Sequence, residues 1–150
     1  MDKLLFEELT SSPEETEALG RRLAQMLEEH PDMPSFIALD GDLGTGKTEF
    51  TRGFVSLLSP GSSVKSPTYA LCNEYGRGKR KIYHFDVYRI KDDDDLYSTG
   101  FYDYPENAVY LIEWASVINY ALPDRRINVS LEKTSEGENM RRIKVTLTDI

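Results

Sequence analysis

The sequence predicts an α/β fold with a largely parallel central sheet that is flanked by helices and completed by a C-terminal antiparallel hairpin. Two observations predict this class. Up to residue 115, short apolar runs of strand type alternate with amphipathic segments that have helical spacing. After residue 125 the pattern changes to two runs in which apolar and polar residues alternate, which is typical of a hairpin with one face in solvent.

The N-terminal segment carries the signals of a strand followed by a helix. Residues 4–9 are a strand candidate, and the helix is predicted from "SSPEE". Ser12 is the expected N-cap, Pro13 occupies the first helical position, and Glu15 is the reciprocal acid of a capping box. We expect this helix to continue to about Glu29.

The remaining elements are predicted from the spacing of their apolar residues. They are a strand at 36–41, a helix at 47–58, strands at 81–90 and 108–115, and a hairpin whose strands, 126–134 and 140–148, flank the turn "SEGEN". No repeat or long linker separates these elements. With 150 residues and 39% hydrophobic content, the chain is expected to fold as one domain over residues 1–150.

Composition also limits the location and the partners of the protein. The N-terminus lacks a signal-peptide pattern and no window approaches a membrane span, so we expect a cytoplasmic protein without a membrane partner. The formal net charge of -8 opposes unaided binding to the phosphate backbone of tRNA or DNA. A role on nucleic acid therefore requires a partner that holds the polymer.

The stretch "GDLGTGKT" satisfies the pattern G-x-x-x-x-G-K-[ST], with a predicted strand before it and a predicted helix after it. This context predicts a small P-loop NTPase fold that binds a purine triphosphate. Backbone N–H groups of the loop surround the β-phosphate, Lys47 reaches the β- and γ-phosphates, and the Thr48 hydroxyl is a ligand for Mg²⁺. The predicted phosphate-binding residues are Gly41, Asp42, Leu43, Gly44, Thr45, Gly46, Lys47 and Thr48.

Two carboxylates are the candidates for hydrolysis. Asp86 and Glu113 each end a predicted buried strand, and parallel strands place such ends at the edge where the phosphate loop lies. One carboxylate can hold Mg²⁺ while the other orients or deprotonates the attacking water, and the residues leave the assignment open. Thr68 is a further candidate, as a switch-like hydroxyl that senses the γ-phosphate. His84 is expected to be a packed core residue and is left outside the catalytic set.

The motifs "GDLGTGKTEFTRGF", "VKSPTY", "YHFDVYRI" and "LIEWA", in this order and spacing, are similar to those of the TsaE (YjeE) family. The resemblance covers most of the chain. It implies a P-loop fold that binds ATP or ADP with Mg²⁺ and has weak ATPase activity within a complex with the TsaB and TsaD proteins. TsaB, TsaD and the TsaE family member together take part in making the threonylcarbamoyladenosine modification at position 37 of ANN-decoding tRNAs. In this complex the TsaE family member supports turnover of TsaD, which is the transfer enzyme.

The resemblance also implies roles for further residues. It adds Glu49 to the nucleotide loop, favours Thr48 and Glu113 on the Mg²⁺ side, and marks Trp114 as a partner or switch residue. It further implies that Pro13 and Asn139 approach the base or ribose. The sequence departs from the family pattern at "EWAS", where proline usually follows E-W, and at Glu49, where a second threonine is common.

Two other functions use the same phosphate loop. A small-molecule kinase commonly carries a lid with several arginines, for which the short segment "YGRGKRK" offers only Arg77 and Arg80. A non-catalytic module, in which nucleotide only orders a partner surface, shares every motif with an ATPase.

Overall fold

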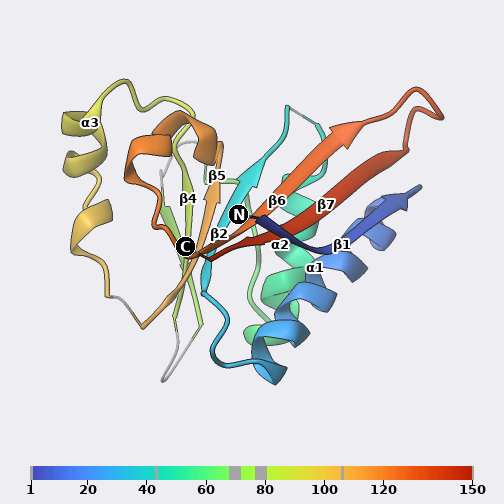
Figure 1. The fold of residues 1–150 in the computed structure, drawn as a ribbon, viewed down its shortest axis with the longest axis horizontal. Helices are drawn as coiled ribbons and strands as arrows, with labels where there is room; N and C mark the ends of the chain where they lie inside the picture. Colours follow the sequence, from blue (N-terminus) through green and yellow to red (C-terminus); the bar gives the residue numbers. More distant parts are fainter. Residues whose placement is uncertain (1, 43, 68–71, 77–80, 106, 150) are drawn as a thin grey trace.

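The computed structural model describes residues 2–42, 44–67, 72–76, 81–105 and 107–149 (Figure 1). The strands are β1 (Asp2–Thr10), β2 (Phe36–Asp40), β3 (Cys72–Tyr75), β4 (Ile82–Asp86), β5 (Val109–Glu113), β6 (Arg126–Lys133) and β7 (Arg141–Thr148). The α-helices are α1 (Pro13–Glu29), α2 (Lys47–Leu58) and α3 (Asp93–Ser98), and the 3-10 helices are η1 (Phe101–Asp103) and η2 (Ala115–Ala121).

The described strands form one seven-stranded sheet in the order β1-β7-β6-β2-β5-β4-β3. The four central strands, β6, β2, β5 and β4, are parallel. Antiparallel pairs complete the two sides of the sheet, with β7 and β1 beside β6 and with β3 beside β4. The predicted α/β class, parallel centre and C-terminal hairpin are therefore confirmed.

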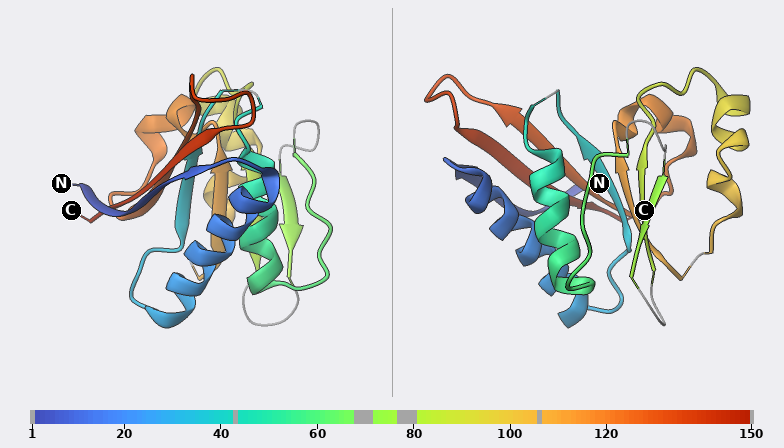
Figure 2. Two further views of the ribbon diagram at one scale, coloured as in Figure 1. Left: turned by 90° about the vertical axis from the view of Figure 1, so that its right-hand side faces the viewer. Right: turned by 180° about the vertical axis from the view of Figure 1, so that it is seen from behind.

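Helices cover both faces of the sheet, with α1 and α2 on one face and α3, η1 and η2 on the other (Figure 2). Strand β2 contributes to both cores, because its side chains alternate between the two faces. Ile37 and Leu39 pack in the cluster that includes α1 and α2, whereas Phe36 and Ala38 pack in the cluster on the opposite face. This burial on both faces is why β2 reads as a continuous apolar run.

Helices α1 and α2 touch through their backbones at two glycines. A Cβ atom on Gly53 would lie 1.8 Å from the carbonyl oxygen of Glu17, and one on Gly20 would lie 2.0 Å from that of Phe50. No larger residue fits at either position without moving a helix. The close contact fixes the position of α2, which begins at the end of the phosphate loop, against α1.

The start of α1 follows the prediction with one correction. The Ser12 hydroxyl accepts a hydrogen bond from the Glu15 N–H at 3.2 Å, and Pro13 is the first helical residue. The Glu15 carboxylate, however, accepts from the N–H and the hydroxyl of Ser11 and not from Ser12. The extended backbone of Ser12 places the preceding N–H, one residue earlier than predicted, within reach of the carboxylate.

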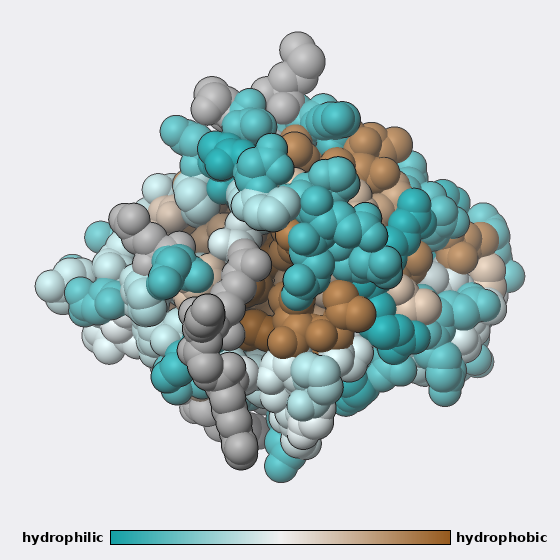
Figure 3. All heavy atoms as spheres, turned by 90° about the horizontal axis from the view of Figure 1, so that it is seen from below, coloured by the Kyte–Doolittle hydropathy of each residue, from teal (hydrophilic) through white to brown (hydrophobic). Residues whose placement is uncertain are grey.

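The surface is mostly polar. Seen from below, hydrophilic residues cover most of the described surface, and apolar residues gather near the centre of this face and toward one side (Figure 3). Tyr88, Tyr97 and Tyr120 are more than half exposed, with relative exposures of 57%, 65% and 58%. In the described part of the chain, no helix has the length and apolar content that crossing a bilayer requires.

Candidate functional site

The phosphate loop connects the end of β2 to the start of α2, and glycine is required at several of its positions. A Cβ atom on Gly41 would lie 2.5 Å from the backbone oxygen of Leu131 and 2.6 Å from the Thr45 hydroxyl. Gly44 and Gly46 have φ angles of 76° and 105°, in the region that favours glycine. The turn therefore brings the N-terminus of α2 to the sheet edge. The N–H groups of the first helical turn have no partner within the helix, so they are available there to bind an anion.

The Lys47 side chain is folded back into this loop. Its Nζ atom donates to the carbonyl oxygen of Gly41 and, at 3.0 Å, to that of Asp42. Burial lowers the pKa of the Lys47 ammonium, and the nearby carboxylates of Glu113 and Asp86 oppose this shift. The ammonium thus contacts the loop carbonyls, and both candidate carboxylates favour its charged form.

Trp114 follows β5 and covers the lysine. Its φ of 63° lies in the left-handed region, which is unusual for a residue other than glycine. This backbone turn places the centre of the indole ring 4.4 Å from Lys47 Nζ. The indole ring also contacts Tyr88, with 4.6 Å between the ring centroids. The aromatic pair therefore forms an apolar wall beside the ammonium.

Asp86 and Glu113 end neighbouring parallel strands and are direct partners in the β4–β5 register. They are only 7% and 3% exposed. The Asp86 carboxylate accepts from the Tyr88 N–H at 2.9 Å. Its pKa is nevertheless raised, first by burial and then by the neighbouring charge of Glu113. Two buried carboxylates side by side provide the negative charge that a divalent cation would neutralise.

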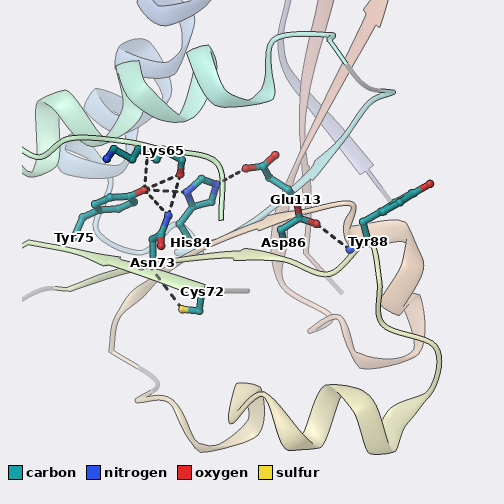
Figure 4. A network of polar contacts seen from close by, with 8 residues as sticks. All are labelled: Lys65, Cys72, Asn73, Tyr75, His84, Asp86, Tyr88 and Glu113. Atoms are coloured by element: carbon teal, nitrogen blue, oxygen red, sulfur yellow. Dashed lines mark hydrogen bonds and ion pairs between the residues drawn. The ribbon is translucent and has the colours of Figure 1, made fainter. Parts of the chain in front are cut away.

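A buried hydrogen-bond network holds Glu113 (Figure 4). His84, which is fully buried on β4, places its Nε2 atom 2.5 Å from Glu113 Oε2. Its other ring nitrogen, Nδ1, lies 3.3 Å from the Tyr75 hydroxyl on β3. Sequence reasoning placed His84 in the core and missed this contact, although the alternation of His84 and Asp86 on one face of β4 was a signal for it.

A pocket of about 130 Å³ opens between the start of α1, the phosphate loop and the C-terminal hairpin. Its lining includes Pro13, Glu49 and Asn139, three residues named in the sequence analysis. Arg141 also lines it and donates to the Gly44 carbonyl at 3.0 Å. No local sequence signal pointed to Arg141, because its loop contact is 97 residues away along the chain.

The structure brings most of the predicted site residues to one edge of the sheet. Asp42 and Gly44 are exposed in the loop, Thr45 is buried with its hydroxyl donating to the Asp42 carbonyl at 2.7 Å, and Thr48 is half-buried in the first turn of α2. Leu43, Thr68, Arg77 and Arg80 lie outside the described residues.

The donor set suits Mg²⁺ bound together with a nucleotide. Asp86 and Glu113 supply carboxylate oxygens, and Thr48 supplies a hydroxyl at the start of α2. Among the described residues, no group of three or more His, Cys, Asp or Glu side chains is arranged to hold a metal. Magnesium commonly uses one or two carboxylates with phosphate oxygens and water, and seldom a cage of protein ligands alone.

Comparison with known proteins identifies the family. The model of the family described as "Threonylcarbamoyl adenosine biosynthesis protein TsaE" matches residues 10–143, which span the strands and helices that build the site. The chain belongs to the TsaE family.

Curated TsaE relatives match over most of their length. Two examples, both with the name tRNA threonylcarbamoyladenosine biosynthesis protein TsaE, show this. The Haemophilus influenzae protein is 36% identical over 129 residues, which are 85% of this chain and 82% of the relative. The Bacillus subtilis protein is 35% identical over 129 residues, or 86% of this chain and 78% of the relative.

A solved structure supports the same assignment. The crystal structure of Bacillus subtilis YdiB matches with a TM-score of 0.75 and 31% sequence identity. The match covers 99% of this chain and 88% of that chain. The fold described above is thus the fold of a solved relative.

Proposed function

We propose that this TsaE family member binds ATP or ADP with Mg²⁺, hydrolyses ATP weakly, and supports the formation of threonylcarbamoyladenosine in tRNA. The observation that carries the proposal is the place of two buried carboxylates at the edge of the sheet that bears the phosphate loop. Glu113 pairs with Leu39 of β2, just before the loop, and Asp86 pairs with Glu113. A phosphate cradle with buried carboxylates near it is the arrangement that phosphoryl chemistry requires. A module that only binds nucleotide with Mg²⁺ would use the same carboxylates as metal ligands, so a measurement of hydrolysis has to separate the two functions.

The chain's own groups divide the work between binding and chemistry. Loop N–H groups and Lys47 bind the phosphates, and the loop carbonyls that now accept from Lys47 Nζ give up that contact when phosphate oxygens replace them. Thr48, Glu113 and Asp86 would hold Mg²⁺, which neutralises charge on the β- and γ-phosphate oxygens when it is bound. Glu113 or Asp86 orients the attacking water, and the Trp114 and Tyr88 rings limit access of bulk water.

The pocket between the start of α1, the phosphate loop and the C-terminal hairpin is the proposed place of the nucleoside. It lies next to Gly44 and Gly46, so a ligand with its phosphates in the loop would extend toward Pro13, Glu49 and Asn139. Thr68 remains the proposed γ-phosphate sensor, and Trp114 the partner or switch residue.

The proposed partners are TsaB and TsaD, and the proposed compartment is the cytoplasm. The names of the TsaE relatives place the relatives themselves in threonylcarbamoyladenosine biosynthesis. TsaB and TsaD are proposed from the family resemblance. The net charge of -8 argues that a partner, and not this chain, holds the tRNA. Nucleotide hydrolysis by this chain would then support turnover of the transfer enzyme TsaD.

The test is a reconstitution of tRNA modification over many turnovers with purified TsaB and TsaD, with and without this chain. We expect modification and ATP turnover both to depend on it. Glu113→Ala should keep the affinity for nucleotide within roughly tenfold, since Lys47 and the loop remain, and should lose most of the hydrolysis.

Glu28→Ala, on the exposed face of α1, is the matched control and should behave as wild type. If Glu113→Ala supported modification without hydrolysing ATP, the chain would be a non-catalytic nucleotide-binding module. If wild type hydrolysed no ATP in the full mixture, the ATPase proposal would be wrong.

A further inference from the structure

Glu113 is the inner end of a line of three hydrogen-bonded side chains that crosses strands β3, β4 and β5. The line runs from the Tyr75 hydroxyl to His84 Nδ1 at 3.3 Å, and from His84 Nε2 to Glu113 Oε2 at 2.5 Å. All three residues are buried, with relative exposures of 7%, 0% and 3%. Buried polar groups connected in this way hold one another in fixed orientations.

The donors and acceptors of the line can be assigned. An ionised Glu113 only accepts, so the proton of a neutral His84 must lie on Nε2. His84 Nδ1 is then an acceptor, and its donor is the Tyr75 hydroxyl. The Lys65 carbonyl also lies 3.3 Å from that hydroxyl. This carbonyl does not depend on the hydroxyl for a hydrogen bond, because it also accepts from the Asn73 amide at 3.0 Å.

The outer end of the line is fixed by backbone. The Lys65 N–H lies 3.4 Å from the Tyr75 hydroxyl oxygen, so that oxygen accepts there. The hydroxyl proton has two acceptors at 3.3 Å, His84 Nδ1 and the Lys65 carbonyl, and the carbonyl is also supplied by the Asn73 amide. Lys65, Asn73 and Tyr75 also line an open groove between the end of α2 and β3. The residues that hold the outer side of the His84 ring therefore lie next to the surface, whereas Glu113 faces the site.

We propose that His84 is a positioning residue for Glu113, and that Tyr75, through its contact with Nδ1, holds the His84 ring in the orientation that this role requires. The proposal rests on the proposed ATPase function. His84 occupies Oε2 of Glu113 and prevents rotation of the carboxylate, which leaves Oε1 directed toward metal or water at the nucleotide. Hydrogen bonds that orient a metal-binding or catalytic carboxylate in this way typically contribute about 10- to 100-fold to activity or metal affinity.

Two amide substitutions separate positioning from packing. His84→Gln places an amide donor near the former Nε2 position and should keep the bond to Glu113, whereas His84→Asn places its amide near Nδ1 and should lose that bond. We expect His84→Asn to lower kcat for partner-stimulated ATP hydrolysis by about 10- to 100-fold with KM changed less than threefold. His84→Gln should recover most of the loss.

A spectroscopic measurement tests the tautomer without activity. The chain has two histidines, His30 and His84, so ¹⁵N-histidine NMR of the whole protein gives two ring spin systems, and His30→Gln assigns them. We expect the Nε2–H tautomer for His84 both in wild type and in Tyr75→Phe, with the ¹⁵N resonance of Nδ1 shifted in Tyr75→Phe because this atom has lost its hydrogen-bond donor. Tyr83→Phe, the same change on the opposite face of β4, is the matched control and should leave the Nδ1 resonance unchanged.

The outcomes distinguish this inference from the proposed function. If wild type hydrolyses ATP with the partners but His84→Asn and His84→Gln have equal kcat values at equal thermal stability, His84 only packs and the inference is wrong. An Nδ1–H tautomer in wild type would also overturn it. If wild type shows no hydrolysis, the ATPase proposal fails, while the NMR result still decides whether Tyr75 donates to His84 Nδ1, because an Nδ1 resonance that is unchanged in Tyr75→Phe would mean that it does not.

Discussion

The Nζ atom of Lys47 lies 4.4 Å from the centre of the Trp114 ring while it donates to the loop carbonyl of Asp42 at 3.0 Å. The ammonium is therefore held from two sides. A bound phosphate has to compete with the carbonyl, whereas the aromatic contact can persist. The ring thus limits the positions that the lysine can take, which reduces the ordering that phosphate binding requires.

Lys47→Ala is expected to weaken binding of ATP with Mg²⁺ by roughly 10- to 100-fold, since a hydrogen bond to a charged group contributes about 1.5–3 kcal/mol. The fold should survive, because burial already penalises the charged form of Lys47 and lowers its pKa. Isothermal titration calorimetry measures the affinity and circular dichroism the fold. Lys144→Ala, which removes an exposed lysine of β7, is the control. Wild-type affinity in Lys47→Ala would contradict the phosphate-cradle interpretation.

Asp86→Asn should make the ligand-free protein more stable at neutral pH while it reduces ATP hydrolysis. Burial raises the folded-state pKa of Asp86 above its ordinary value of 3.8. As pH rises above 3.8, the unfolded chain therefore loses this proton before the folded chain does, and stability falls until the folded-state pKa is passed. The wild-type free energy of unfolding should show this decrease, and the Asn variant should lack it.

Urea denaturation across a pH series, without nucleotide or metal, measures the effect of Asp86. Asp149→Asn, which changes an exposed carboxylate near the C-terminus, is the control for a general loss of negative charge. Parallel stability curves for wild type and Asp86→Asn would contradict the assigned pKa shift.

Gly53→Ala is expected to destabilise the protein by about 3 kcal/mol, the upper end of the usual cost of overpacking, because the added methyl would meet the Glu17 carbonyl oxygen at 1.8 Å and neither backbone can move aside easily. Gly61→Ala is a useful comparison. Gly61 has φ of 88° but open space around it, so alanine there costs only the left-handed backbone term of about 1–2 kcal/mol. Equal unfolding free energies in the two variants would mean that helix contact is not the cause.

The isolated chain should not bind tRNA with submicromolar affinity at physiological salt, because its net charge of -8 repels the phosphate backbone. The most basic described stretch, residues 141–144, is partly neutralised. Arg142 lies 3.7 Å from Glu136 and 3.9 Å from Glu132, and Arg141 donates to backbone carbonyls. Gel shifts with the chain alone, and with TsaB and TsaD added, check the expectation. Tight binding by the chain alone would show that local charge outweighs net charge.

Much of the fold was predictable because its signals are local. The period of apolar residues, the Ser12 and Pro13 helix start, and the glycines before α2 depend on neighbours in sequence. The strand order was not predictable in the same way. The pairing of Asp2 with Thr148 joins the first and last strands, and no local pattern specifies which edge of a sheet a terminal strand will occupy.

The candidate site was predictable where it follows strand ends. Asp86 and Glu113 were found because parallel strands bring their carboxyl ends together. Two neighbours of the site, His84 and Arg141, escaped because their roles depend on contacts across strands. A buried histidine looks the same in sequence whether it packs or binds a carboxylate, and an arginine in a hairpin gives no sign of the loop that it will reach.

The contact between Arg141 and the Gly44 carbonyl has a consequence for synthesis of the protein on the ribosome. A nascent chain that ends before residue 126 already contains the whole phosphate-loop motif, yet it lacks β6, whose Leu131 packs against Gly41, and it lacks the arginine that reaches Gly44. Emergence of the C-terminal hairpin from the exit tunnel is therefore the event that completes the pocket. We therefore expect the proposed nucleotide binding to require the finished chain and to be absent from fragments still under translation.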